Sequence, residues 1–164
     1  GKVKRIVLYD TLLKKMEKSE ILSVLAHEAG HWKKKHVLKM IIVIEAMSLI
    51  GIYISFLMIK SGILIRIFNI QNDTVFANLL ILGFAGGIVS FPMTPIFSYF
   101  SRRHEREADG FAAEMTENRE AMATSLIKLS KDNLSNLHPH PLYASFYYSH
   151  PPVVQRIREI RGKQ

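Results

Sequence analysis

The sequence predicts a mainly α-helical protein that crosses a membrane with two helices and carries a short β element at its N-terminus. Residues 40–59 contain one charged side chain, Glu45, and residues 74–101 contain none. Each run exceeds the roughly 18 apolar residues that mark a membrane-spanning helix. Two buried core helices are the alternative, but a chain of 164 residues could hardly enclose such long segments. We therefore expect spans at about 40–59 and 76–100.

The composition agrees with a membrane protein and excludes several other classes. The net charge is +8 and 48% of the residues are hydrophobic. A basic chain that is also this apolar indicates contact with anionic membrane lipid. No zinc-finger spacing, RNA-binding signature or basic-aromatic stripe is present, so no nucleic-acid partner is expected. The chain has no cysteine, which excludes disulfides and cysteine-ligated metal sites.

The first ten residues contain the predicted β element. Lys4–Tyr9 is a strand-like run that would form one half of a hairpin. Asp10 or Thr11 can cap a helical turn that continues to Met16. Because the sequence starts with glycine instead of methionine, we interpret residues 1–164 as one domain within a longer protein.

The central motif is His27-Glu28-Ala29-Gly30-His31, in a predicted helix that begins at Ser19. Residues four apart on a helix lie one turn above each other, so His27 and His31 point the same way. Two imidazoles in this arrangement can share one zinc ion. Glu28 lies at the edge of the same face, where it can take a proton from a zinc-activated water. This is the zincin arrangement; a chance match on a charged surface helix is the alternative.

Positive charges flank the two predicted spans on their outer sides. The connection between the spans carries only two positive residues, Lys60 and Arg66, and one negative residue, Asp73. The positive-inside tendency then places both outer ends in the cytoplasm and residues 60–73 on the far side. The hairpin thus returns the chain to the side on which the histidine motif lies. The flanking residues are Lys33, Lys34, Lys35 and Lys39 before the first span and Arg102, Arg103 and Arg106 after the second.

A second motif, acidic, follows the second span within Ser101–Asp109. A catalytic zinc usually takes three protein ligands and leaves the fourth position to water. Glu105 and Asp109 are four apart and share a helix face, with Glu105 long enough to bind the metal. Asp109 is expected to accept the free N–H of a ligand histidine. Glu107 is turned about 200° from Glu105 and is expected to face solvent or Arg103. A helix start rich in salt bridges is the alternative. The two motifs together predict a zincin-like (gluzincin) core.

The C-terminal part is predicted to hold two scaffold helices around a loop-rich stretch. Thr116 can cap a helix over residues 117–131. Residues 132–149 carry prolines and aromatics, and the aromatics are expected to pack. The last helix opens at Ser149-His150-Pro151-Pro152, since proline is tolerated in a first turn, and is expected to stop near Gly162.

Three blocks, with the two spans between the first and the second, carry a specific resemblance. The blocks are His27-Glu28-Ala29-Gly30-His31-Trp32, Ser101-Arg102-Arg103-His104-Glu105-Arg106-Glu107-Ala108-Asp109, and Ser149-His150-Pro151-Pro152 with Arg156. With these blocks in this order, the sequence resembles the C-terminal portion of the membrane-embedded zinc CAAX prenyl proteases. The similarity covers nearly the whole chain.

The resemblance implies a helical intramembrane barrel around a hydrated chamber that a zinc-peptidase site faces. It implies one Zn²⁺ per chain and prenylated protein substrates, cut on the carboxyl side of the modified cysteine near the C-terminus. The family has further spans before this region. The implied roles are zinc ligands for His27, His31 and Glu105, catalytic base for Glu28, support of a ligand for Asp109, and contact with the substrate backbone or the developing oxyanion for His150 and Arg156.

Two other functions stay open. An HtpX-like membrane quality-control protease would share both zinc motifs but act on unprenylated proteins, whereas Trp32 and the Ser-His-Pro-Pro block favour the prenyl protease. A zinc-stabilised membrane scaffold without turnover is the reading from another class, and Glu28 argues against it. We expect a multi-pass membrane protein with its active site on the cytoplasmic side, in the endoplasmic reticulum of a eukaryote or the inner membrane of a prokaryote.

Overall fold

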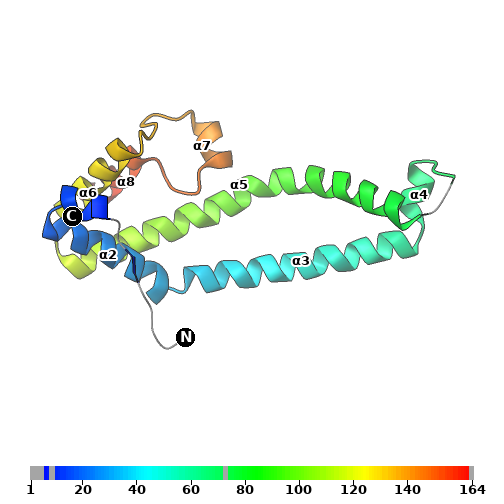
Figure 1. Ribbon diagram of the computed structural model, residues 1–164, viewed down its shortest axis with the longest axis horizontal. Coiled ribbons are helices and arrows are strands. Elements are labelled where there is room, and N and C mark those ends of the chain that lie inside the picture. Colours follow the sequence, from blue (N-terminus) through cyan, green and yellow to red (C-terminus); the bar gives the residue numbers. More distant parts are fainter. Residues whose placement is uncertain (1–5, 8–9, 72–73, 163–164) are drawn as a thin grey trace. The chain divides into compact units, whose positions relative to one another are not determined.

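The computed structural model describes residues 6–7, 10–71 and 74–162, and these residues are mainly α-helical (Figure 1). The predicted β element falls mostly outside these residues, and Ile6 and Val7, which are described, do not form a strand. The helices are α1 (Asp10–Lys15), α2 (Lys18–Lys33), α3 (His36–Lys60), α4 (Ile63–Ile67), α5 (Val75–Thr116), α6 (Arg119–Asp132), α7 (Pro141–Tyr147) and α8 (Val153–Gly162).

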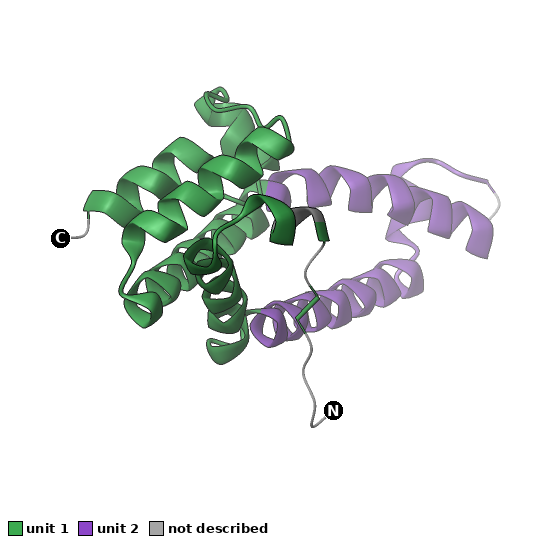
Figure 2. Ribbon diagram, turned by 60° about the vertical axis from the view of Figure 1, so that its left-hand side comes forward, with its two compact units in different colours: residues 1–36, 95–164 green, residues 37–94 purple. Residues whose placement is uncertain are grey.

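The chain divides into two compact units (Figure 2). One unit contains residues 1–36 and 95–164, and the other contains residues 37–94. The boundary in α5 falls directly before Pro95. Proline lacks the amide hydrogen that a helix interior requires, so the backbone hydrogen bonding of α5 is interrupted where the units divide.

The smaller unit exposes the apolar residues that the sequence assigned to membrane spans. In the most apolar 18-residue window of α3 no residue is buried, and in that of α5 only 11% are buried. A core helix of a soluble protein would be mostly buried, so this exposure argues against two hidden core helices. Together with their length, this exposure identifies α3 and α5 as candidate membrane-spanning helices of a membrane protein.

The acidic motif lies within a continuous helix and not at a helix start. With 42 residues, α5 is about twice as long as the roughly 20 residues that cross a bilayer. Its apolar part therefore continues directly into the turns that carry Glu105 and Asp109. Those turns belong to the larger unit.

The core of the larger unit is formed by α2, the last turns of α5, α6 and α8. In this unit α6 packs against both α2 and α8. These helices share a buried apolar cluster, and its burial fixes the faces that α2 and α5 turn toward each other. The members of the cluster are Ala26, Ala112, Met122, Leu126 and Ile160, with Val153 and Ile157 packed against them.

The helices α2 and α5 approach closely where Gly30 faces Ala108. A Cβ on Gly30 would lie 3.2 Å from the Cα and 3.3 Å from the carbonyl oxygen of Ala108, and 3.1 Å from Cδ1 of Phe111. Ala108 is fully buried. A larger side chain at Gly30 would therefore have to push the two backbones apart.

One helix cap and two short helices differ from the sequence-based expectation. Thr116 does not cap the following helix, because its hydroxyl donates to the carbonyl of Ala112 within α5. Asn118 takes that role and accepts the amide of Ala121 at 2.9 Å. The short helices α4 and α7 lie in stretches that we expected to be connections.

Candidate metal centre

Three side chains from α2 and α5 bring their donor atoms together. Nε2 of His27 lies 3.2 Å from Nε2 of His31. Glu105 reaches both imidazoles, with Oε2 3.5 Å from Nε2 of His27 and Oε1 3.2 Å from Nε2 of His31. These are the three residues that the sequence placed at the metal, and among the described residues they form a group able to hold one ion.

The spacing of these donors fits zinc. Bonds of about 2.0–2.1 Å at the tetrahedral angle separate two donor atoms by about 3.3–3.4 Å, close to the distances between the three side chains. Oε2 of Glu105 is also fully buried, and no contact to it has the geometry of a hydrogen bond. Two imidazoles and one carboxylate are the ligand set of a known class of catalytic zinc sites, so the residues present fit the metal.

Asp109 lies behind His27 and is itself held by Arg156. Oδ1 of Asp109 is 2.9 Å from Nδ1 of His27. Nε and Nη2 of Arg156 donate to the two carboxylate oxygens of Asp109 at 2.8 and 2.6 Å. Since Nδ1 of His27 faces Asp109, Nε2 is left to face His31 and Glu105. Arg156 is only 8% exposed, which favours support of Asp109 over contact with a substrate.

The buried charges favour a cation in the centre. Burial alone would lower the pKa of His27, but the contacts to Asp109 and Glu105 outweigh it and raise this pKa to about 9. Burial likewise acts to lower the pKa of Arg156, and the bond to Asp109 raises it. Two buried carboxylates thus face one buried guanidinium. With neutral imidazoles the site is negative, and a bound dication would displace the proton of His27.

His150 reaches the same carboxylate from the solvent side. Its Nδ1 lies 2.8 Å from Oε2 of Glu105, while 63% of its side chain is exposed. The segment before it is fixed by Arg102, whose Nη1 donates to the carbonyl of Tyr148 at 2.8 Å and to two carbonyls of α7. The hydroxyl of Ser98 donates to the carbonyl of Phe146 at 2.8 Å. These contacts give α7 and the following segment a fixed place on α5.

Glu28 is exposed and directly follows His27 on α2. A carboxylate at this position is accessible to water and to a peptide. The structure thus brings the predicted site residues His27, His31, Glu105, Asp109, His150 and Arg156 together in one unit.

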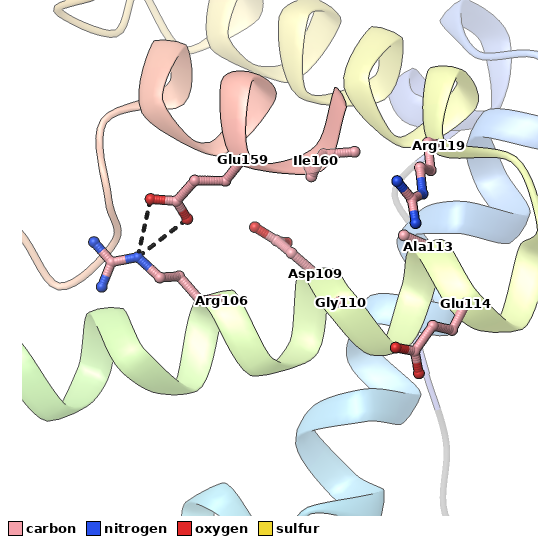
Figure 3. Close-up of a pocket in the computed structure, with 8 residues that line it drawn as sticks. All are labelled: Arg106, Asp109, Gly110, Ala113, Glu114, Arg119, Glu159 and Ile160. Carbon is pink, nitrogen blue, oxygen red and sulfur yellow. Dashed lines mark hydrogen bonds and ion pairs between the residues drawn. The ribbon is translucent and has the colours of Figure 1, made fainter. Parts of the chain in front are cut away.

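A small recess next to Asp109 separates α5 from α8 (Figure 3). Figure 3 shows Asp109 pointing from α5 toward α8, with the Arg106–Glu159 pair closing one side. Nε of Arg106 donates to Glu159 at 3.1 and 3.3 Å, which ties the two helices together. The recess has about 40 Å³, which is too small for a peptide. It is therefore not a substrate cleft.

Sequence reasoning missed two residues around the centre. His36 contacts His31 and Glu107, with Nε2 of His36 3.2 Å from Oε2 of Glu107. Glu107 also accepts Nε of Arg103 at 3.1 Å, as expected from their spacing. Arg102 was read only as a charge that sets membrane orientation. No local sequence pattern could have revealed the contacts of His36 or of Arg102, because these residues contact segments that are not their neighbours on one helix face.

Substitutions should distinguish Glu105, the predicted metal ligand, from its acidic neighbours by their effect on zinc affinity. We expect Glu105→Ala to lower zinc affinity far more than Asp109→Ala, which should lose the roughly 10–100-fold typical of residues that orient a ligand. Glu107→Ala should also lose far less than Glu105→Ala. Competition with a chromophoric chelator measures the three affinities. Equal losses at Glu105 and Glu107 would contradict this assignment.

Comparison with known proteins agrees with the geometry. The model of the family described as Peptidase family M48 matches residues 1–164. The chain is 35% identical to "CAAX prenyl protease 1 homolog" of Arabidopsis thaliana over 99% of its own length and 38% of that protein. It is 36% identical to "Uncharacterized metalloprotease YhfN" of Bacillus subtilis over 100% of its own length and 39% of that protein.

A solved structure shares the fold. The crystal structure of S. mikatae Ste24p superposes with a TM-score of 0.81 at 27% identity, over 95% of this chain and 39% of that one. The chain therefore spans less than half the length of these relatives. The resemblance to the CAAX prenyl proteases is confirmed, and the match over the whole chain shows that this protein belongs to peptidase family M48.

Proposed function

We propose that this chain is the catalytic portion of a membrane zinc endopeptidase that cuts prenylated CAAX proteins near their C-terminus. The observation that carries the proposal is the cluster of His27, His31 and Glu105, whose donor atoms lie 3.2–3.5 Å apart. The exposed Glu28 directly follows His27 in the sequence. The substrate class comes from relatives named CAAX prenyl protease 1.

In this mechanism Glu28 is the base. A zinc ion held by the three ligands would polarise the scissile carbonyl and lower the pKa of a water to about 7. Glu28 accepts one proton from the water while the water oxygen forms a bond to the carbonyl carbon. The bond between that carbon and the peptide nitrogen then breaks. Glu28 returns the proton to the leaving amine, so the products are a carboxylic acid and an amine.

The remaining residues orient the reacting groups. His150 donates a hydrogen bond to the carbonyl oxygen as it gains negative charge, since its exposed ring lies next to Glu105 and is not needed as a ligand. Arg102 holds the backbone just before His150. Asp109 keeps the proton of neutral His27 on Nδ1, and Arg156 fixes Asp109.

Two alternatives lead to different measurements. A quality-control protease would cut unprenylated proteins equally well, and the relative from Bacillus subtilis is named only as a metalloprotease. A zinc-stabilised scaffold would not hydrolyse peptides. A group of three donors, with the exposed Glu28 next to His27 in the sequence, supports catalysis, because a structural zinc site normally closes its fourth position with a further ligand.

Paired peptides test the proposed substrate. We expect the zinc-loaded protein, in its natural length, to cut a prenylated CAAX peptide on the carboxyl side of the modified cysteine. The unprenylated twin should be cut far more slowly, and mass spectrometry identifies both products. Equal cleavage of the two peptides would support the quality-control alternative. If neither peptide were cleaved, the result would support the zinc-stabilised scaffold without hydrolysis.

Two variants in the same assay test the roles within the site. Glu28→Gln should retain zinc and lose hydrolysis, whereas Glu114→Gln, at an exposed glutamate of α5, should retain both. His150→Ala should retain zinc and lower kcat by about 10²–10³. Zinc loss in either Glu28→Gln or His150→Ala would mean that the residue supports the metal instead of the reaction.

We also propose that the site faces the cytoplasm. The positive flanks of α3 and α5 support this orientation, with the connection at 60–73 on the other side. Single cysteines at Ser61 and Lys33, both exposed, can be labelled separately because the chain contains no other cysteine. An impermeant reagent added to sealed vesicles should label one and not the other. Labelling of both from one side would exclude the topology.

A further inference from the structure

His36 is a fully buried histidine that the proposed reaction does not use. It begins α3, belongs to the larger unit and is 2% exposed. Its Nδ1 lies 3.1 Å from Nδ1 of His31, and its Nε2 lies 3.2 Å from Oε2 of Glu107. The ring of His104 stacks on it with centroids 4.2 Å apart and planes 8° from parallel. Both ring nitrogens and one ring face of His36 are therefore engaged.

The backbone at Lys35 makes the contact with His31 possible. On an unbroken helix, residues five apart are about 140° apart around the axis, so their side chains cannot meet. Here α2 ends at Lys33, and Lys35 has a φ of 57°, in the left-handed region that L-residues rarely adopt. This break re-aims the chain so that His36 faces back toward His31.

The contacts of His36 can be satisfied by one arrangement of protons when the ring is neutral. Nε2 of His36 faces the carboxylate of Glu107, which only accepts, so Nε2 must carry the hydrogen. Nδ1 of His36 is then an acceptor, and Nδ1 of His31 must donate to it. Nε2 of His31 is left with its lone pair, and this is the atom that faces His27 and Glu105.

We propose that His36 is a positioning residue for the metal ligand His31, through a relay from His31 to His36 to Glu107. The relay keeps the hydrogen of His31 on Nδ1 and its ring plane fixed, as Asp109 does for His27. Arg103 holds the far end by donating to Glu107. The effect on zinc rests on the proposed metal site, whereas the relay itself is a property of the metal-free protein.

The protonation of His36 tests the relay directly. Side-chain ¹⁵N spectra of the metal-free protein, with labelled histidine, report which ring nitrogen carries hydrogen. We expect a neutral His36 with hydrogen on Nε2, and a His31 with hydrogen on Nδ1. A His36 with hydrogen on Nδ1, or on both nitrogens, would overturn the proposal. This measurement uses no zinc and no activity, so it stands even if the proposed function fails.

Substitutions then test whether the relay acts on zinc. The amide oxygen of His36→Asn lies near the position of Nδ1 and can still accept from His31, so zinc affinity should stay within a few-fold of wild type. His36→Gln places its amide near Nε2 and loses that acceptor, as does His36→Leu. We expect both to lose roughly 10–100-fold in zinc affinity. His138→Leu, at an exposed histidine, is the matched control and should change nothing.

The pattern across the variants distinguishes positioning from simple packing. A structural role would make His36→Asn as damaging as His36→Gln, since both remove the ring that stacks on His104. Equal zinc affinities for His36→Asn and His36→Gln would therefore overturn the proposal. If the wild-type protein binds no zinc, the proposed function fails and the ¹⁵N spectra alone decide the relay.

Discussion

The close approach of α2 and α5 at Gly30 is the constraint on which the candidate metal centre depends. His27 and His31 lie on either side of Gly30 in the sequence, and Glu105 and Asp109 lie on either side of Ala108. Because Gly30 has no Cβ, the two backbones can approach until Glu105 lies between the two imidazoles. One glycine thus fixes the distance between the histidine and carboxylate donors, and the core of α6 and α8 keeps the helices in this position.

Each of the two histidines that we propose as zinc ligands has its own support, and the two supports differ in chemistry. His27 faces a carboxylate that a buried arginine holds with two hydrogen bonds. His31 faces a second imidazole, which passes the interaction on to Glu107. A carboxylate makes its imidazole more basic than a neutral ring does. The two sides of the centre are therefore inequivalent, with the stronger negative charge behind His27.

The sequence predicts the parts of this site that depend on local periodicity. The spacing of four residues aligns His27 with His31 and Glu105 with Asp109. The near absence of charged residues in two long segments locates both candidate membrane-spanning helices. Periodicity does not reveal that α5 continues through its prolines into the acidic motif, because packing decides whether a helix continues. It also cannot reveal His36, whose contact with His31 requires a break in the helix, or Arg102, whose partners are backbone carbonyls more than 40 residues away. Such contacts exist only in the folded chain.

Zinc affinity as a function of side-chain size at Gly30 tests the central claim most directly. Alanine and leucine are both good helix formers, so Gly30→Ala and Gly30→Leu differ mainly in the volume placed against Ala108. The account predicts a stepwise loss of zinc affinity, with leucine more damaging than alanine. The same two substitutions at Gly51, where a Cβ would meet nothing within 4 Å, should leave the affinity unchanged. Wild-type zinc affinity in Gly30→Leu would contradict the claim that this helix contact assembles the metal centre.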